Sequence, residues 1–325
     1  MRAVVQRRYG GPDTLALEHL PVPSPGPDEV LVEVHAAGVD RGTEHLMTGR
    51  PWLVRLAGYG LRRPRNPVPG LDVAGRVVAV GAAVTRFRIG DEVLGTARGS
   101  FAEYAVAPES ALAAKPVEVS FVEAAALTVS GTTALEALVD VGGPVAGRRV
   151  LVIGASGGVG SHAVQIARVL GARVDAVAGT PNLAYVAALG ADTVHDHRTT
   201  SLDAVDTRYD LVVDIGGRNP LRRLRRLLLP GGTLVIVGGE NGNRLTGGVG
   251  RQVRALVWSR FIAERLAVFI SEPSADRIER LLTLVTDGGL RPPVEAVFPL
   301  AEAPTALRHL ASGSSRGKTV LTVRP

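Results

Sequence analysis

The sequence contains no cysteine in its 325 residues. This absence excludes disulfides, iron–sulfur clusters, thiolate zinc ribbons and a thiol nucleophile. Aromatic residues make up only 4% of the chain, and its 37 Lys and Arg against 31 Asp and Glu form no aromatic–basic stripe. We therefore expect no nucleic-acid partner, although the net charge of +6 suits a small ligand rich in phosphate.

Long apolar runs are also missing. No run approaches the roughly 20 residues that a membrane-spanning helix needs. The first residues, "MRAVVQRRYGG", hold no apolar core of a signal peptide. We therefore expect a cytoplasmic protein with no membrane partner. Its length suits two domains, and 46% hydrophobic against 21% charged residues is typical of a globular chain.

Residues 1–120 form the first predicted domain. Stretches such as "VLVEVHAAGV" and "VAGRVVAVG" are rich in β-branched residues and end at Gly, Pro or Asp. This pattern predicts short strands in a β-rich domain. A loop at 49–69 is long enough to be a lid or a binding loop. The capping box "SFVE", with Ser120 and Glu123, predicts a helix start where the first domain ends.

Residues 121–291 form the second predicted domain, and residues 292–325 are expected to rejoin the first. Fully apolar runs alternate here with helical patterns, which predicts an α/β fold with a doubly wound parallel sheet. The strands are expected at 150–153, 174–178, 193–195, 211–214 and 233–237.

A glycine-rich loop follows the first of these strands. Its spacing is A-x-G-x-x-G, a dinucleotide fingerprint with alanine at the first small position. Gly157 would let the backbone approach a pyrophosphate, and Gly160 would let the helix pack closely on the strand. The alternative is a tight strand–helix turn without a nucleotide. The predicted cofactor-binding residues of this loop are Ala155, Ser156, Gly157, Gly158, Val159 and Gly160.

The end of the second predicted strand lacks the acid that binds the ribose of NAD in such folds. Ala178 stands at that place, 178 − 157 = 21 residues after Gly157. An alanine leaves room for a 2′-phosphate and removes the repulsion that a carboxylate would exert. We expect NADPH as the cofactor, with its 2′-phosphate near Ala178, Gly179, Thr180, His197 and Arg198.

The chain resembles the medium-chain dehydrogenase/reductase superfamily over nearly its whole length. The resemblance is carried by "VLVEVHAAGVDRG", "PVPGLDVAGRVVAVG", "GSFAEYAVAP", "AAALTVSGTTALEAL", "LVIGASGGVG", "YDLVVDIGG" and "RGKTVLTV". It implies a GroES-like substrate domain, a Rossmann domain and an active site in a cleft between them. It also implies that Thr133, Gly238 and Gly239 lie near the cofactor, and that Asp214, Gly216 and Gly217 line the carboxyl edge of the sheet.

Zinc-dependent members of this superfamily need metal ligands that the sequence lacks. Where they place a first cysteine this chain has Asp40, and their "G-H-E" reads Gly70-Leu71-Asp72. We therefore expect no metal site and a closer likeness to the zinc-independent, quinone-oxidoreductase-like branch. The implied reaction is hydride transfer from NADPH to a quinone or an α,β-unsaturated carbonyl. An alcohol or aldehyde oxidoreductase, and a cofactor-binding sensor or partner protein with little turnover, remain as alternatives.

Three residues are candidates for the chemistry, namely Asp40, His45 and Tyr59. Asp40 lies where the family places substrate-side residues, but it is also suited to bond local backbone in a turn. His45 is either a proton donor or a histidine that only packs. Tyr59 either reaches the substrate from the long loop or packs within it.

A second apolar pattern follows at "RQVRALVWSRFIAERLAVF", which is amphipathic at helical spacing. A helix on a membrane surface has a similar pattern. In the family context we expect it to cover the active site or to form part of a homodimer contact.

Overall fold

The computed structural model describes residues 1–238, 247–313 and 315–324. The chain divides into two compact units, which are described separately here. The first unit comprises residues 1–132, 272–286 and 292–325, and the second comprises residues 133–271 and 287–291. The change expected near residue 120 coincides with the start of a helix, while the division by contacts falls further along that same helix.

The first unit is built on a seven-stranded sheet. Its strands run in the order β14-β15-β3-β4-β5-β7, with β6 paired to β3, and all neighbours are antiparallel except β14 and β15. A separate hairpin joins β1 (Arg2–Gln6) to β2 (Leu15–His19). The strands of the large sheet are β3 (Glu29–Val39), β4 (Asp72–Val80), β5 (Glu92–Thr96), β6 (Tyr104–Pro108), β7 (Leu112–Ala114), β14 (Val294–Pro299) and β15 (Lys318–Thr322).

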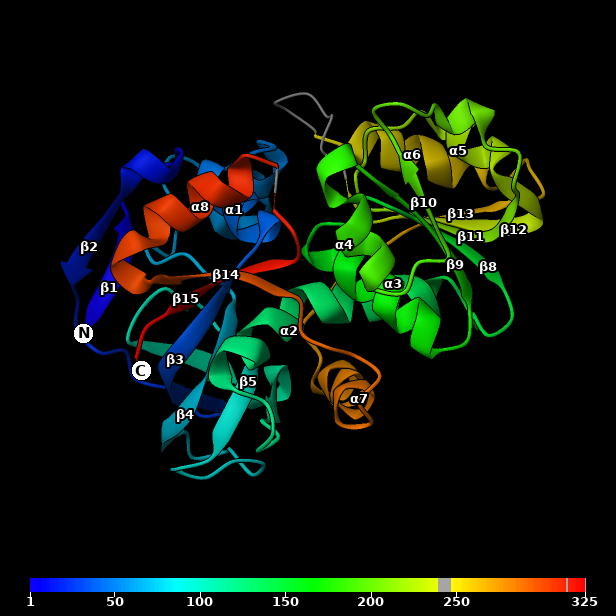
Figure 1. The fold of residues 1–325 in the computed structure, drawn as a ribbon. Coiled ribbons are helices and arrows are strands. Elements are labelled where there is room, and N and C mark those ends of the chain that lie inside the picture. The colour runs from blue at the N-terminus through cyan, green and yellow to red at the C-terminus, as the bar shows by residue number, and fades with distance from the viewer. Residues whose placement is uncertain (239–246, 314, 325) are drawn as a thin grey trace. The chain divides into compact units, whose positions relative to one another are not determined.

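Helices pack around this sheet (Figure 1). They are α1 (Arg41–Thr48), α7 (Ala275–Thr286) and α8 (Ala303–Ala311), together with the first part of α2 (Phe121–Leu135). Valines of β3 and β4, Phe101 and leucines of α8 form one buried cluster, which is the core of this unit. The C-terminal strand β15 lies between β14 and β3, so residues far apart in sequence complete the sheet.

The second unit is a six-stranded parallel sheet. Its order is β10-β9-β8-β11-β12-β13, and the direction of growth reverses between β8 and β11. This is the strand order of a dinucleotide-binding fold, in which ligands bind at the carboxyl edge beside the reversal. The strands are β8 (Arg149–Ile153), β9 (Arg173–Ala178), β10 (Thr193–Asp196), β11 (Tyr209–Asp214), β12 (Leu228–Ile236) and β13 (Arg265–Val268).

The helices of the second unit cover this sheet. Helices α3 (Gly158–Val169) and α4 (Leu183–Ala188) pack on β8, β9 and β10, while α5 (Leu221–Arg226) and α6 (Val249–Trp258) pack on β12 and β13 (Figure 1). The central strands β8, β9 and β11 are mostly buried, as their apolar runs require. The predicted α/β class, with a doubly wound parallel sheet and a β-rich domain, is confirmed.

The prediction of one amphipathic helix over 251–269 is partly wrong. Helix α6 ends at Trp258, and residues Arg265–Val268 form the sixth strand β13. The run "RLAV" pairs in parallel with β12. Backbone pairing to a buried strand therefore decides the structure of these four residues, which helical spacing alone assigned wrongly.

The capping box at the start of α2 is confirmed. The Ser120 backbone N–H donates to Glu123 Oε2 at 2.9 Å, and the Glu123 N–H donates to Ser120 Oγ at 3.2 Å. Helix α2 and the π-helical turn Glu136–Val141 together form a helical stretch of 21 residues, which by length and mean hydropathy alone is long and apolar enough to cross a membrane. Two thirds of its most apolar window, 67%, is buried inside the protein, as in a core helix.

Candidate cofactor and active site

The glycine loop lies at the carboxyl end of β8, next to the point where the strand order reverses. Gly160, in the first turn of α3, touches the backbone that directly follows β8: a Cβ atom there would lie 2.2 Å from the Gly154 carbonyl oxygen and 2.7 Å from Ala155 Cα. Only a glycine allows this approach. The backbone N–H groups of Gly154 and Ala155 both donate to the Val177 carbonyl, which ties the loop to β9.

The N-terminus of α3 carries no side-chain cap. Its N-cap residue Gly157 has extended backbone (φ −80°, ψ 177°) and makes no side-chain hydrogen bond. The first N–H groups of a helix have no partner within the helix, and they attract anions together with the helix dipole. A Cβ at Gly157 would have only the Gly154 oxygen nearby, at 3.9 Å. This open backbone fits a pyrophosphate.

Two polar side chains form hydrogen bonds to the glycine loop. Ser161 Oγ donates to the Gly157 carbonyl at 2.8 Å, and Asn182 Nδ2 donates to Ser156 Oγ at 3.1 Å. Asn182 was missed in the sequence. Its position just after the end of β9 is a signal that would have found it, because the chain returns to the glycine loop there.

The residues expected around a 2′-phosphate lie together. Ala178 ends β9 beside Asp196 of β10, and the His197 N–H donates to the Ala178 carbonyl at 3.0 Å. A Cβ built on Gly179 would lie 3.2 Å from His197 Nε2 and 3.6 Å from Arg198 Nε. Two basic side chains therefore lie beside the end of the second strand.

An acid that the sequence did not reveal also lies there. Asp196 accepts a hydrogen bond from the Thr180 hydroxyl at 2.6 Å and one from the Arg198 N–H at 2.9 Å. These two donors lower the pKa of the Asp196 carboxyl. The Thr180 hydroxyl, expected to meet a phosphate, is thus turned toward a carboxylate.

The carboxyl edge of the sheet holds a buried ion pair. Asp214, at the end of β11, accepts hydrogen bonds from Arg251 Nη2 of α6 and, at 3.2 Å, from the Gly217 N–H. Burial raises the pKa of Asp214, and Arg251 opposes this effect. Gly238 follows β12, and a Cβ there would lie 1.9 Å from the Ile215 carbonyl oxygen. Gly239 lies outside the described residues.

Thr133 is the first residue of the second unit and lies within α2. It is half-buried, and its role near a cofactor stays a prediction.

The three candidates for the chemistry belong to the first unit. Asp40 is the N-cap of α1, where its Oδ1 accepts the Thr43 N–H at 2.7 Å. His45 lies on α1 and is half-buried, and Tyr59 ends the π-helical turn Arg55–Tyr59 with 48% of its surface exposed. The turn-forming role considered for Asp40 is therefore real, but it engages only one carboxylate oxygen.

The second oxygen of Asp40 belongs to a buried charge cluster. Lys318 Nζ lies 2.7 Å from Asp72 Oδ2 and 4.0 Å from Asp40 Oδ2, and all three side chains are at most 7% exposed. Burial raises the pKa of Asp40, and Lys318 opposes this effect. Burial lowers the pKa of Lys318, but the Asp72 and Asp40 carboxylates outweigh it and leave that pKa raised. No pattern in the sequence singled out Lys318, which lies 318 − 72 = 246 residues after Asp72.

Two family models match the chain. Residues 26–117 match the alcohol dehydrogenase GroES-like domain, and residues 189–321 match a family described as zinc-binding dehydrogenase. The chain is 33% identical to the chloroplast envelope quinone oxidoreductase homolog of Arabidopsis thaliana, covering 99% of this chain and 98% of that protein. It is 32% identical to the NADPH-dependent alkenal/one oxidoreductase of the same plant, covering 99% of this chain and 79% of that protein.

Solved structures show the same fold. The quinone oxidoreductase from Coxiella burnetii aligns with a TM-score of 0.88 and 28% identity, over 100% of this chain and 99% of that one. An NAD-dependent alcohol dehydrogenase aligns with a TM-score of 0.82 and 32% identity, over 99% of this chain and 100% of that one.

The zinc named by one family description does not fit the residues present. In the described part of the chain, no group of three His, Cys, Asp or Glu side chains could hold a metal ion. The two carboxylates at the positions considered above, Asp40 and Asp72, already face the ammonium of Lys318. The position between these two carboxylates is therefore occupied by the Lys318 ammonium.

Substitutions of two glycines separate ligand binding from packing. Gly157→Ala adds a methyl group where the protein leaves room, so the unfolding midpoint should stay unchanged. The same methyl blocks the approach of a pyrophosphate, so calorimetry should show NADPH binding weakened by about tenfold or more, roughly 1.4 kcal/mol. Gly160→Ala should lower the midpoint, because overpacking costs about 1–3 kcal/mol. Unchanged NADPH affinity in Gly157→Ala would contradict this assignment.

Proposed function

We propose a reaction for this chain on the premise that it belongs to the medium-chain dehydrogenase/reductase superfamily, in its quinone-oxidoreductase-like branch. The chain is an oxidoreductase that reduces a quinone or an α,β-unsaturated carbonyl. Bound NADPH would supply the hydride, from C4 of its nicotinamide ring. The observation that carries the proposal is the N-terminus of α3, which has no side-chain cap and lies where the strand order changes direction between β8 and β11. Relatives that match the chain over nearly its full length are quinone and alkenal/one oxidoreductases.

The second unit binds the cofactor in this proposal. The free N–H groups at Gly158, Val159 and Gly160 hold the pyrophosphate, and the loop from Ala155 to Gly157 gives it backbone to lie against. Thr133, Gly238 and Gly239 are proposed, on the family likeness, to lie toward the nicotinamide end.

NADPH rather than NADH is proposed on the charges around Ala178. His197 and Arg198 flank Gly179, so they are placed to meet a 2′-phosphate. Asp196 already accepts hydrogen bonds from Thr180 and the Arg198 backbone, which leaves its charge partly compensated.

The first unit handles the acceptor. Hydride addition to an enone or quinone leaves negative charge on oxygen, which needs a hydrogen bond and then a proton. Asp40, His45 and Tyr59 are proposed to contact the substrate. Of the three, His45 and Tyr59 carry groups that can donate a hydrogen bond to that oxygen, whereas the Asp40 carboxylate, fixed by the Thr43 N–H and facing Lys318, can only accept one.

Catalysis is proposed to be independent of zinc, since no group of three potential zinc ligands is found in the described residues. A second candidate, alcohol oxidation on the same scaffold, is favoured by the likeness to an NAD-dependent alcohol dehydrogenase at 32% identity. The cytoplasmic location also stays a prediction.

A substrate panel separates the two reactions. The purified protein should oxidise NADPH with quinones or α,β-enones as acceptors, and should reduce NADP⁺ with simple alcohols at least about tenfold more slowly, a difference of about 1.4 kcal/mol in the barrier. The measurement is the absorbance of the reduced cofactor. Faster turnover with alcohols would favour the second candidate, and tight cofactor binding without any turnover would favour a sensor.

Ala178→Asp tests the choice of cofactor. A carboxylate beside the 2′-position repels a phosphate and accepts a hydrogen bond from a ribose hydroxyl. The ratio of the dissociation constants for NADPH and NADH should therefore rise by about tenfold or more. Ala178→Ser, which is small and uncharged, is the matched control and should leave the ratio unchanged. A constant ratio in Ala178→Asp would count against the 2′-pocket placed here.

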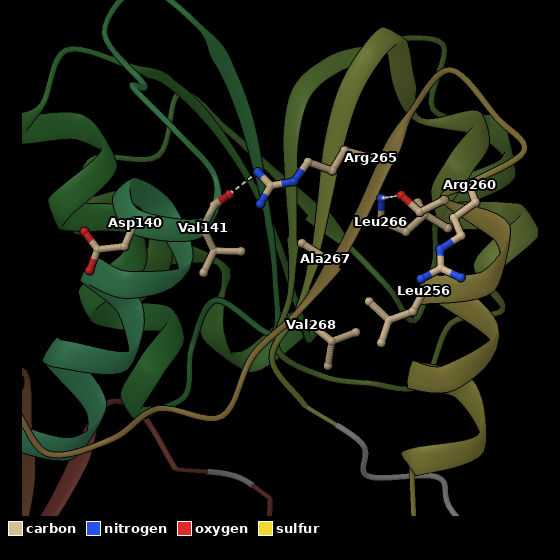
Figure 2. Close-up of a pocket in the computed structure, with 9 residues that line it drawn as sticks. Asp140, Val141, Leu256, Arg260, Arg265, Leu266, Ala267 and Val268 are labelled. Atoms are coloured by element: carbon tan, nitrogen blue, oxygen red, sulfur yellow. Dashed lines mark hydrogen bonds between the residues drawn. The ribbon is translucent and has the colours of Figure 1, made fainter.

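The chain is further proposed to form a homodimer through the edge strand of the second unit. Strand β13 pairs only with β12 among the described strands, so its outer edge is free to pair. A hollow of about 470 Å³ lies beside α6 and β13. Among its lining residues, Arg265 Nη1 donates to the Val141 carbonyl at 2.7 Å (Figure 2). Large apolar side chains are exposed nearby, namely Val253, Leu256, Val257, Phe261 and Ile270.

Charged substitutions in this patch test the dimer. Light scattering after gel filtration should give the mass of two chains for the wild type, and Phe261→Asp combined with Ile270→Asp should shift it toward one. Val117→Asp, at a 92% exposed position in the first unit, is the control and should leave the dimer intact. A wild-type protein that elutes as a single chain of 33.9 kDa would overturn the proposal.

A further inference from the structure

The first unit buries three charged side chains side by side. Asp40, Asp72 and Lys318 come from three places in the chain: the start of α1, the start of β4 and the start of β15. An ammonium or carboxylate removed from water is costly unless an opposite charge and hydrogen bonds compensate it. Two carboxylates here face one ammonium.

In each carboxylate, one oxygen accepts a backbone hydrogen bond and the other faces the ammonium. Asp72 Oδ1 accepts the Val129 N–H of α2 at 2.6 Å, and Asp40 Oδ1 accepts the Thr43 N–H of α1. The remaining oxygen of each, Oδ2, points to Lys318 Nζ. Asp40 Oδ2 is buried and has no hydrogen-bond partner in the described residues. The arrangement therefore presents two carboxylate oxygens to a central cation.

The backbone closes tightly around this place. Gly38 of β3 could carry no side chain, because a Cβ would lie 2.5 Å from Asp72 Oδ2 and 2.5 Å from the Ala125 carbonyl oxygen. The Lys318 N–H donates to the Pro293 carbonyl at 2.7 Å, which fixes the start of β15. The Lys318 ammonium therefore lies in a confined position, beside backbone at Gly38 that leaves no room for a side chain.

We propose that Lys318 is a tethered cation: its ammonium fills a two-carboxylate cation site, and removing its side chain opens that site to a divalent cation. Carboxylate oxygens are ligands that Mg²⁺ and Mn²⁺ prefer. A cation fixed to the chain cannot dissociate. The Lys318 ammonium therefore holds the starts of α1, β4 and β15 together whether or not metal ions are present. Asp40 always has this positive charge beside it.

A cycle of substitutions tests the compensation of charge. Lys318→Met keeps the length of the side chain and removes the charge, and Asp40→Asn keeps the oxygen that caps α1. Asp40→Asn should not raise the unfolding midpoint of the wild type, whereas it should raise that of Lys318→Met, because it removes an uncompensated carboxylate. If Lys318→Met alone yields no folded protein, recovery of folded protein on adding Asp40→Asn is the same result.

The matched control is another buried lysine with a single carboxylate. The Lys115 side chain is 5% exposed, and its Nζ lies 3.0 Å from Glu92 Oε2. Arg76 also pairs with Glu92, so Glu92→Gln should shift the midpoint in the same direction with or without Lys115→Met. The proposal is overturned if Asp40→Asn shifts the wild type and Lys318→Met by the same amount, or fails to recover folded protein.

Uptake of Mn²⁺ tests the site itself. Free Mn²⁺ is measured by electron paramagnetic resonance with the full chain as wild type, Lys318→Ala, Lys115→Ala and Asp40→Asn with Lys318→Ala. Only Lys318→Ala should bind a single tight Mn²⁺ and gain thermal stability from it. Mn²⁺ uptake by Lys318→Ala no greater than that of the wild type, or unchanged by Asp40→Asn, would overturn the proposal. Neither test uses enzyme turnover, so failure here is distinct from failure of the proposed reaction.

Discussion

The contact of α3, at Gly160, with the backbone that directly follows β8 is the constraint on which the cofactor site depends. Since the helix comes so close to this backbone, it begins directly at the carboxyl edge of the parallel sheet, and its first N–H groups have no partner within the helix. A polar side chain as N-cap would satisfy one of these groups. Gly157 does not, so the helix terminus keeps both its donors and its partial positive charge for a ligand.

The first unit depends on a different interaction, which is the buried contact of one ammonium with two carboxylates. Lys318, at the start of β15, reaches Asp72 and approaches Asp40. Removing one partner of a buried ion pair typically costs roughly 3–5 kcal/mol. The C-terminal strand is therefore tied electrostatically to the helix start that carries Asp40. In the reaction proposed above, hydrogen bonds polarise the acceptor.

Periodicity and glycine spacing predicted the second unit well, because local rules govern it. The five expected strands are all present, and "ASGGVG" turns between a strand and a helix. The rest depended on contacts that sequence spacing does not encode. Strand β13 was hidden in a helical pattern, Asp196 was not foreseen beside Thr180, and Lys318 reaches Asp72 only through the fold. Where a side chain's role is set by a partner hundreds of residues away, no local pattern can predict it.

Transfer of an isotope label tests the central claim most directly, namely hydride transfer from a cofactor bound at α3 without a metal. Chelator-treated protein, its zinc content measured, is given NADPH deuterated at C4 and an α,β-unsaturated ketone, and the product is examined by NMR. The account predicts full activity, negligible zinc and deuterium at the β-carbon of the product. Loss of turnover on chelation that zinc restores, or a product without the label, would contradict it.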